Sequence, residues 1–155
     1  DDSCGLSEKI SVWLWKIGEV FMMKIVVAID SLKGSLTSIQ AGEAIEKGIK
    51  KVDLEAEVVI KPLADGGEGC LDAQTAMGKA PIGVAKLAKK YGKLVLGFSG
   101  AVTKGATACN EAGIDAYFPI VRSAVSLEDA MKKKNAQENL IDTVEQVFRV
   151  IKALK

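Results

Sequence analysis

The chain has 155 residues, of which 48% are hydrophobic, and its 21 basic and 20 acidic residues leave a net charge of +1 at pH 7. A chain of this length and apolar content can form one ordinary domain with its own core, and its near-neutral charge gives no sign of a nucleic-acid partner. It contains no histidine, which excludes hydrolases built on Ser-His-Asp or Cys-His and leaves carboxylates, lysines, thiols and tyrosines as candidate acids and bases.

The three cysteines are Cys4, Cys70 and Cys109, and no two of them form a Cys-x-x-Cys pair. An odd number without that spacing argues against a disulfide framework, and without histidine a structural zinc site is also unexpected. The sequence therefore favours a protein of the reducing cytoplasm.

Residues 1–22 are expected to be a leader unrelated to the domain that follows. They carry an apolar stripe interrupted by Lys9, Lys16 and Glu19, and their acidic start lacks the basic end of a signal peptide. The stripe consists of Trp13, Trp15, Ile17, Val20 and Phe21. A membrane span is therefore not expected. Two interpretations stay open: an appended stretch that contributes little to the domain, or an amphipathic docking helix.

The first part of the domain shows a strand, a helix and a second strand. Residues 24–29 are a short β-branched apolar run, typical of a buried parallel strand. Thr37 and Gln40 have the spacing of a capping box, and apolar residues at helical intervals follow them. Residues 56–60 read as a strand that Pro62 and the glycines after it bring to an end.

The rest of the domain continues this alternation. Pro81 suits the first turn of a helix and Gly92 the position after its end, while Gly113 ends a second helix and Ser126 caps a third. The expected strands are residues 94–99 and 116–121, and the expected helices are residues 81–91, 105–112, 126–133 and 137–154. Pro119 lies inside the second of these strands and predicts an edge position or an early end.

Strands that alternate with helices predict an α/β fold. We expect a single Rossmann-like domain over residues 23–155, with a mainly parallel sheet and helices on both faces. In such sheets ligands bind at the carboxyl ends of the strands. The loops expected there are residues 30–35, 65–69 and 99–103.

Two of these loops carry residues suited to a charged ligand. Asp30-Ser31-Leu32-Lys33-Gly34-Ser35 offers backbone N–H groups, two hydroxyls and an ammonium, as an anion site requires. It is not a Walker A sequence, and plain turn chemistry would explain it equally well. Asp65-Gly66-Gly67-Glu68-Gly69 places two carboxylates on a backbone that can approach a ligand closely, which suits a metal–nucleotide site or a base for a hydroxyl. A simple Gly-rich connection is the alternative.

The motifs in residues 23–37 and 62–69 resemble, at the expected spacing, the opening of a bacterial two-domain glycerate kinase. Residues 67–85 resemble a later signature of the same family, and residues 91–154 resemble its C-terminal end. The family's long middle segment is missing between them. The resemblance therefore implies a domain assembled from the N-terminal and C-terminal segments of the family. They would join near residues 69–70 at a shared Gly-Glu-Gly, with the second family domain absent.

This resemblance implies an enzyme that transfers the γ-phosphoryl group of ATP to a hydroxyl of glycerate and yields a phosphoglycerate. Mg²⁺ would arrive on the nucleotide rather than in a protein metal cluster. The implied catalytic residues are Lys33, Asp65 and Asp72, and Asp65 or Asp72 would be the contact for Mg²⁺. The residues implied in substrate or nucleotide binding are Asp30, Ser31, Gly34, Ser35, Gly66, Gly67, Glu68, Gln74 and Lys79. No nucleic-acid or membrane partner is implied, and a homo-oligomer is compatible with the sequence.

The chain departs from the family pattern in ways that predict impaired activity. Ile29 stands where the family usually has proline, Leu32 where it usually has phenylalanine, and Cys70 where a basic residue usually follows the second Gly-Glu-Gly. A thiol cannot replace a permanently charged guanidinium. The missing middle segment would also remove one wall of the cleft. Two alternatives to a working kinase therefore stay open: a catalytically dead remnant that binds an anion or nucleotide weakly, and a structural or oligomerising fragment.

Overall fold

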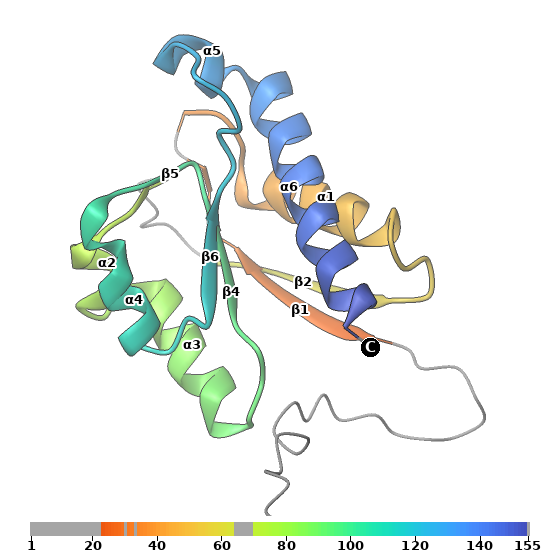
Figure 1. Ribbon diagram of the computed structural model, residues 1–155, viewed down its shortest axis with the longest axis vertical. Coiled ribbons are helices and arrows are strands. Elements are labelled where there is room, and N and C mark those ends of the chain that lie inside the picture. Colours follow the sequence, from red (N-terminus) through yellow and green to blue (C-terminus); the bar gives the residue numbers. More distant parts are fainter. Residues whose placement is uncertain (1–22, 30, 33, 64–69, 155) are drawn as a thin grey trace, which may run out of the picture.

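The computed structural model describes residues 23–29, 31–32, 34–63 and 70–154. Figure 1 shows helices and strands alternating along most of this part of the chain. The strands are β1 (Lys24–Ile29), β2 (Glu57–Pro62), β3 (Cys70–Leu71), β4 (Leu96–Ser99), β5 (Ala101–Val102) and β6 (Ala116–Pro119). The helices are α1 (Ser38–Lys50), α2 (Ala73–Ala76), α3 (Ala80–Lys90), the 3-10 helix η1 (Lys104–Thr107), α4 (Ala108–Glu111), α5 (Leu127–Met131) and α6 (Lys133–Ala153).

The three pairs of named strands are parallel, and together with the helices they confirm the predicted α/β class. β1 pairs with β2, β3 with β5, and β4 with β6, so the strands form three separate pairs rather than one continuous sheet. Val26 lies opposite Val59 in the first pair, and Phe98 lies opposite Phe118 in the last. Among the described residues, no strand lies between β1 and β4 and joins them by hydrogen bonds.

The start of α1 is set by the capping box that the sequence predicts. The backbone N–H of Gln40 donates to Thr37 Oγ1 at 3.3 Å, and the N–H of Thr37 donates to Gln40 Oε1 at 3.2 Å. These two bonds satisfy N–H groups that would otherwise have no partner at the helix start. Lys47 and Lys50 lie in the last turn, where positive charge is favourable.

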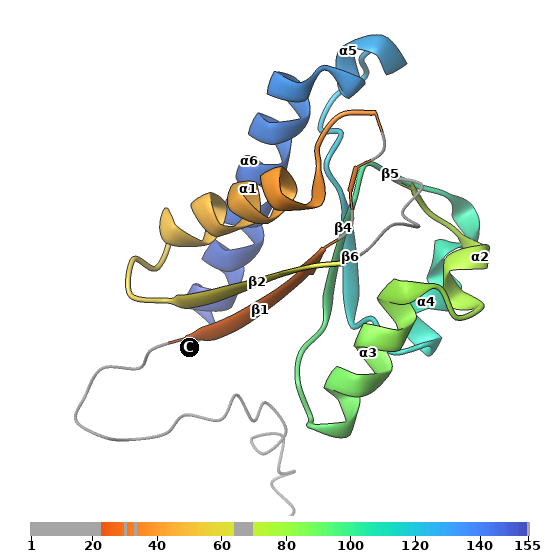
Figure 2. The same ribbon diagram turned by 180° about the vertical axis from the view of Figure 1, so that it is seen from behind.

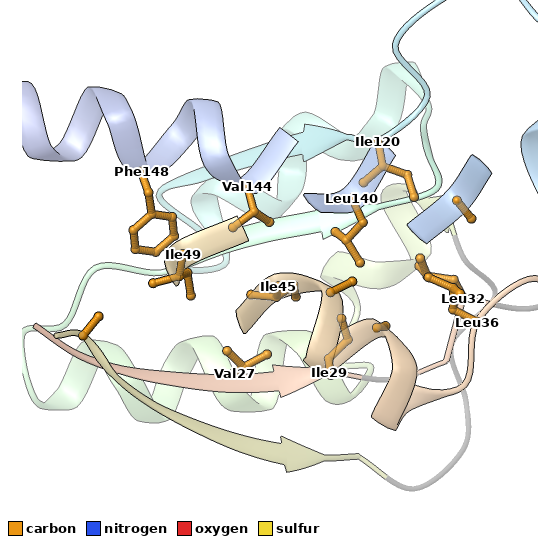
Figure 3. Close-up of a cluster of buried hydrophobic side chains, with 14 residues drawn as sticks. Val27, Ile29, Leu32, Leu36, Ile45, Ile49, Ile120, Leu140, Val144 and Phe148 are labelled. Atoms are coloured by element: carbon orange, nitrogen blue, oxygen red, sulfur yellow. The ribbon is translucent and has the colours of Figure 1, made fainter. Parts of the chain in front are cut away.

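The first core cluster lies between the β1–β2 pair and the helices α1 and α6. Figure 3 shows Val27 and Ile29 of β1 facing the helices, with Ile49 of α1 and Val144 of α6 among the side chains above them. Phe98 of β4 packs against the same cluster, and Ile120, just after β6, is part of it. This shared core holds the β1–β2 and β4–β6 pairs together although no hydrogen bonds join them.

The second core cluster lies on the other face of the β4–β6 pair. Its buried members are Leu71, Ile82, Ala85, Ala106, Cys109 and Ile114, and Tyr117 of β6 packs against them. Phe98 and Tyr117 thus face opposite clusters. The predicted arrangement of helices on both faces is therefore confirmed for this strand pair. Among the described residues no helix is long and apolar enough to cross a membrane.

Several element boundaries differ from the sequence expectation. The helix expected over 105–112 is a 3-10 turn followed by the short helix α4, and Gly113 ends it at φ +114°. The last helix begins at Lys133 rather than at 137, because α6 follows α5 directly. Lys132 between them is the C-cap residue of α5 and the N-cap residue of α6. The strand expected over 116–121 ends at Pro119, as the proline implied.

The contact between α1 and α6 depends on Gly48, which has no space for a side chain. A Cβ there would lie 2.7 Å from the carbonyl oxygen of Ile141 and 2.9 Å from Cβ of Val144. We expect Gly48→Ala to lower the free energy of unfolding by about 1–3 kcal/mol, because the helices must move apart. The matched control is Gly83→Ala in α3, where a Cβ meets nothing within 4 Å. That substitution should raise the unfolding free energy by about 0.5–1 kcal/mol. Urea denaturation measures both, and equal effects would contradict the packing argument.

Asp115 ties the end of α3 to the start of β4. Its carboxylate accepts a bond from the Val95 N–H at 2.7 Å and pairs with the ammonium of Lys89. Burial raises the pKa of Asp115, but the hydrogen bonds from Lys89 and Val95 and the charge of Lys89 outweigh it. They hold the pKa below its ordinary value.

Acid should therefore destabilise the chain partly through Asp115. The pKa of Asp115 is lower in the folded chain than in the unfolded chain. Its stabilisation is thus complete above an unfolded-state pKa of about 3.9 and is lost as the pH falls through the folded-state value. We expect Asp115→Asn to flatten the fall of the melting temperature below about pH 4. Asp53→Asn controls for the loss of one negative charge. An unchanged acid slope in Asp115→Asn would contradict this role.

Candidate functional site

The loop after β1 is a tight turn held by two buried leucines. The Leu32 carbonyl accepts bonds from the Ser35 N–H at 2.9 Å and from the Leu36 N–H at 3.1 Å, and the Leu32 N–H donates to the Leu36 carbonyl at 2.9 Å. Leu32 and Leu36 both belong to the first core cluster. Leu32 therefore anchors the loop in the core.

Two predicted binding residues in this loop have defined local roles. Gly34 adopts φ +83°, which favours glycine, and the end of the Met131 side chain from α5 occupies the space that a Cβ would take. Ser35 Oγ donates to the Leu32 carbonyl at 3.0 Å. The Ser35 hydroxyl proton is therefore committed to the turn, and its oxygen retains the capacity to accept a hydrogen bond.

The predicted catalytic residue Asp72 directly precedes the short helix α2. Its Oδ1 accepts bonds from the Thr75 N–H at 2.8 Å and from Thr75 Oγ1 at 3.0 Å, and the Asp72 N–H donates to Thr75 Oγ1 at 3.3 Å. This reciprocal pattern is that of an N-terminal cap. It fixes the position of a half-buried carboxylate at the end of β3.

Two residues that the sequence reasoning missed contact this loop. Thr75 is buried and supplies the cap bonds, and its place three residues after Asp72 is the local signal that could have identified it. Cys109 of α4 is buried and its Sγ lies 3.7 Å from the Asp72 carbonyl oxygen as a donor. Burial, and then the charge of Asp72, raise the pKa of Cys109, so this thiol stays protonated. No local pattern in the sequence indicates this contact, because it joins residues that are 37 positions apart.

The other predicted residues are placed only in part. Lys79 is the N-cap residue of α3, and Ser31 is half-buried in the loop after β1. Gln74 lies in α2, and its side chain is outside the described part. Asp30, Lys33, Asp65, Gly66, Gly67 and Glu68 also lie outside the described residues. That Lys33, Asp65 and Asp72 meet at one site therefore stays a prediction.

The described loops do gather at one end of the molecule. Figures 1 and 2 both show the loop after β1 beside the segment that joins β4 to β5. The Thr103 N–H donates to the Leu71 carbonyl at 3.0 Å, which ties the residue after β5 to the end of β3. Ser99, buried at the end of β4, donates to the Ala101 carbonyl at 2.7 Å. The carboxyl ends of these parallel strands are where α/β proteins bind ligands.

A hollow lies at the end of α1 that is opposite the loop after β1. It is lined mainly by the end of α1 and by α6, including Lys50, Lys51 and Asp142. Lys50 Nζ already donates to the carbonyls of Leu54 and Ala56. Lys51 pairs with Glu145 at 3.0 Å, a contact that is the main reason why the pKa of Lys51 is raised. These cations are engaged within the fold, so the strand-end loops remain the candidate site.

Comparison with known proteins gives matches to one family. A sequence profile described as the glycerate kinase family matches residues 25–73 and 67–152. The glycerate kinase of Bacillus subtilis is 41% identical over 122 residues, which are 77% of this chain and 31% of that protein. The glycerate kinase of Haemophilus influenzae is 37% identical over 121 residues, 75% of this chain and 30% of that protein. The chain thus spans about a third of the length of these relatives.

Two further proteins are similar to parts of the chain. The glycerate 2-kinase of Escherichia coli is 38% identical over 95 residues, 59% of this chain and 25% of that protein. A crystal structure of a putative glycerate kinase 2 from Salmonella typhimurium shares 40% sequence identity over 37% of this chain and 16% of that chain, with a TM-score of 0.28. The two ranges matched by the family profile overlap in residues 67–73, which include the Gly-Glu-Gly expected at the junction.

Proposed function

The chain belongs to the glycerate kinase family, and we propose that it supplies the N-terminal and C-terminal parts of an enzyme that phosphorylates glycerate with ATP. The observation that carries the proposal is the double family match, with its overlap at 67–73 and its coverage of about a third of the relatives. By itself the chain binds nucleotide or glycerate weakly at most. Turnover requires the missing segment, because phosphoryl transfer depends on a closed site that excludes water.

The loop after β1 is the proposed anion-binding element. The N–H groups of Leu32, Ser35 and Leu36 are bonded within the turn, so the feature that favours an anion here is the α1 N-terminus that follows. Gly34 supplies the positive φ that this turn requires. Lys33 is proposed to neutralise charge on that group. Ser35 shapes the loop through its bond to Leu32, and its oxygen is left as an acceptor for a substrate hydroxyl.

Asp72 is the proposed group that accepts the proton of the glycerate hydroxyl or contacts Mg²⁺. Its cap bonds to Thr75 hold the carboxylate in one orientation, and ordered geometry of this kind is what phosphoryl transfer needs most. Asp65 is the proposed second carboxylate, and Asp30, Gly66, Gly67, Glu68, Gln74 and Lys79 are proposed contacts for substrate or nucleotide.

The donor set fits a metal that arrives with the nucleotide. Within the described ranges, no three or more acidic or cysteine side chains are placed to hold a metal ion. Mg²⁺ commonly uses one or two protein carboxylates together with substrate phosphates, so Asp72 with or without Asp65 would suffice. Bound there, the ion would neutralise charge on the β- and γ-phosphates.

The test compares the purified chain with a version that carries a glycerate kinase middle segment after Gly69, followed by a second Gly-Glu-Gly. We expect ATP-dependent formation of phosphoglycerate only in the restored version. Lys33→Ala should abolish it, whereas Lys47→Ala, an exposed lysine at the other end of α1, should not. Robust turnover by the short chain, itself lost in Lys33→Ala, would overturn the view that the middle segment is essential. A restored version that folds but stays inactive would overturn the proposed function.

A further inference from the structure

The backbone at Asp72 is held by the two ends of one segment, residues 103–109. At one end of this segment, the Thr103 N–H donates to the Leu71 carbonyl at 3.0 Å, directly before Asp72. At the other end, Cys109 Sγ donates to the Asp72 carbonyl at 3.7 Å. Figures 1 and 2 show α2 and α4, which follow these two stretches, side by side. The residues between Thr103 and Cys109 therefore run alongside the Asp72 loop.

Lys104 is the only charged residue in this segment, and it is exposed. The register of β3 and β5 places Leu71 opposite Val102, so that Asp72 and Thr103 follow at the ends of two neighbouring strands. Neighbouring strands are about 4.8 Å apart. Lys104 is the next residue after Thr103, and its ammonium stands on a flexible four-carbon stem. It can therefore reach a group that is bound beside Asp72.

The backbone of Lys104 is fixed, whereas its ammonium is available. The Thr103 carbonyl accepts a bond from the Ala106 N–H at 3.0 Å, which starts η1. Ala106 and Cys109 are fully buried in the second core cluster and anchor the segment. Among the described residues, the Lys104 side chain takes part in no ion pair or hydrogen bond. A cation that is anchored in this way and is not used by the fold is suited to a ligand.

We propose that Lys104 is a second cation of the candidate site and binds an anionic oxygen group, either a phosphate of the nucleotide or the carboxylate of glycerate. The identity of these two ligands rests on the proposed function. A site that holds both ligands next to the Asp72 carboxylate must balance several negative charges, and charge-assisted bonds from cations do this. Lys33 belongs to the loop after β1 and Lys104 follows β5, so the proposed site draws cations from two strand ends.

The test is a titration of the full 155-residue chain, followed through the chemical shifts of its backbone amides. The ligands are ATP with Mg²⁺, tripolyphosphate with Mg²⁺, and glycerate, each added separately. We expect weak binding that shifts the amides of Leu71 and Thr103. Lys104→Ala should raise the Kd about 3- to 10-fold, and Lys104→Arg should keep most of the affinity because it keeps the charge. An effect on ATP and tripolyphosphate assigns the contact to phosphate, and an effect on glycerate alone assigns it to the carboxylate.

Lys93→Ala is the matched control. Lys93 is also exposed, but it lies between α3 and β4, at the amino end of the strand that leads to Lys104. This variant should bind all three ligands as the unchanged chain does. Added salt should weaken binding less in Lys104→Ala than in the unchanged chain, because a screened charge contact is already missing there. A purely structural role of Lys104 would not change the salt dependence. Circular dichroism checks that each variant is folded.

Three results would overturn the assignment. They are equal effects of the Lys104 and Lys93 variants, shifts centred on the lysine-lined hollow at the end of α1, and no binding of any of the three ligands. None of them decides the proposed function, which depends on turnover by the version with a restored middle segment. If that version is folded but inactive while binding to the short chain depends on Lys104, the proposed function is wrong and the anion site stands.

Discussion

Asp72→Asn should reduce phosphoryl transfer by about 10²- to 10⁴-fold in the version with a restored middle segment, while leaving the melting temperature nearly unchanged. Asparagine keeps an oxygen that can accept the bonds from Thr75, and it is as good an N-terminal cap as aspartate. It cannot take up the proton of the glycerate hydroxyl, and it brings no charge to Mg²⁺. The substitution therefore separates the chemical role of Asp72 from its structural role.

The matched control for this prediction is Asp53→Asn. Asp53 also uses its carboxylate within its own loop, where Oδ1 accepts a bond from the Glu55 N–H at 3.1 Å. It follows α1, far along the helix from the loop after β1. Phosphoglycerate formation and thermal melting should both be unaffected. Full activity of Asp72→Asn would show that Asp72 only caps α2, and a large fall in melting temperature would show that the amide does not preserve the cap.

Ile49→Ala should lower the free energy of unfolding by about 2–5 kcal/mol, a large share of the roughly 5–15 kcal/mol that stabilises an ordinary domain. Ile49 of α1 is fully buried in the first core cluster, where α1 packs against α6 and the β1–β2 pair. Removing three carbons there leaves a cavity that the packed helices cannot close. The loss of apolar burial and the cavity both act in the same direction.

Ile39→Ala is the control, because it makes the same change in the same helix at a residue that is 59% exposed. Little burial is lost there and alanine is the better helix former, so we expect a change below about 1 kcal/mol. Urea denaturation of both variants gives the comparison. Similar losses at the two positions would mean that the first core cluster does not carry the stability assigned to it.

Local sequence patterns predicted the elements whose ends are set by nearby residues. Thr37 and Gln40 lie three positions apart, so their spacing alone indicated the start of α1, and the same holds for Ser126 at the start of α5. Gly92, at φ +62° after α3, was predictable from its place beyond the last apolar residue. These signals need no knowledge of the rest of the fold.

Features that depend on distant partners were not predictable in this way. β3 and β5 have two residues each, too short for a period of two to appear, and they exist only because Cys70 and Leu71 meet Ala101 and Val102. The strands form three separate pairs, and this depends on which strands become neighbours in space. Apolar runs in the sequence indicate where strands lie along the chain but not which of them pair. For the candidate site, Asp72 was named from the family resemblance alone, and neither the strand β3 before it nor its contact with Cys109 was predicted.

The two core clusters differ in how much chain must be gathered to build them. The second is made from residues between Leu71 and Tyr117, whereas the first joins α1 to α6, which are separated by that entire stretch. Closing so long a loop costs chain entropy before its contacts form, so the second cluster has the kinetic advantage during folding. During synthesis, the second core cluster can therefore form before α6 has left the ribosome. The loop after β1 belongs to the first cluster and becomes ordered only when α6 is available to pack against it.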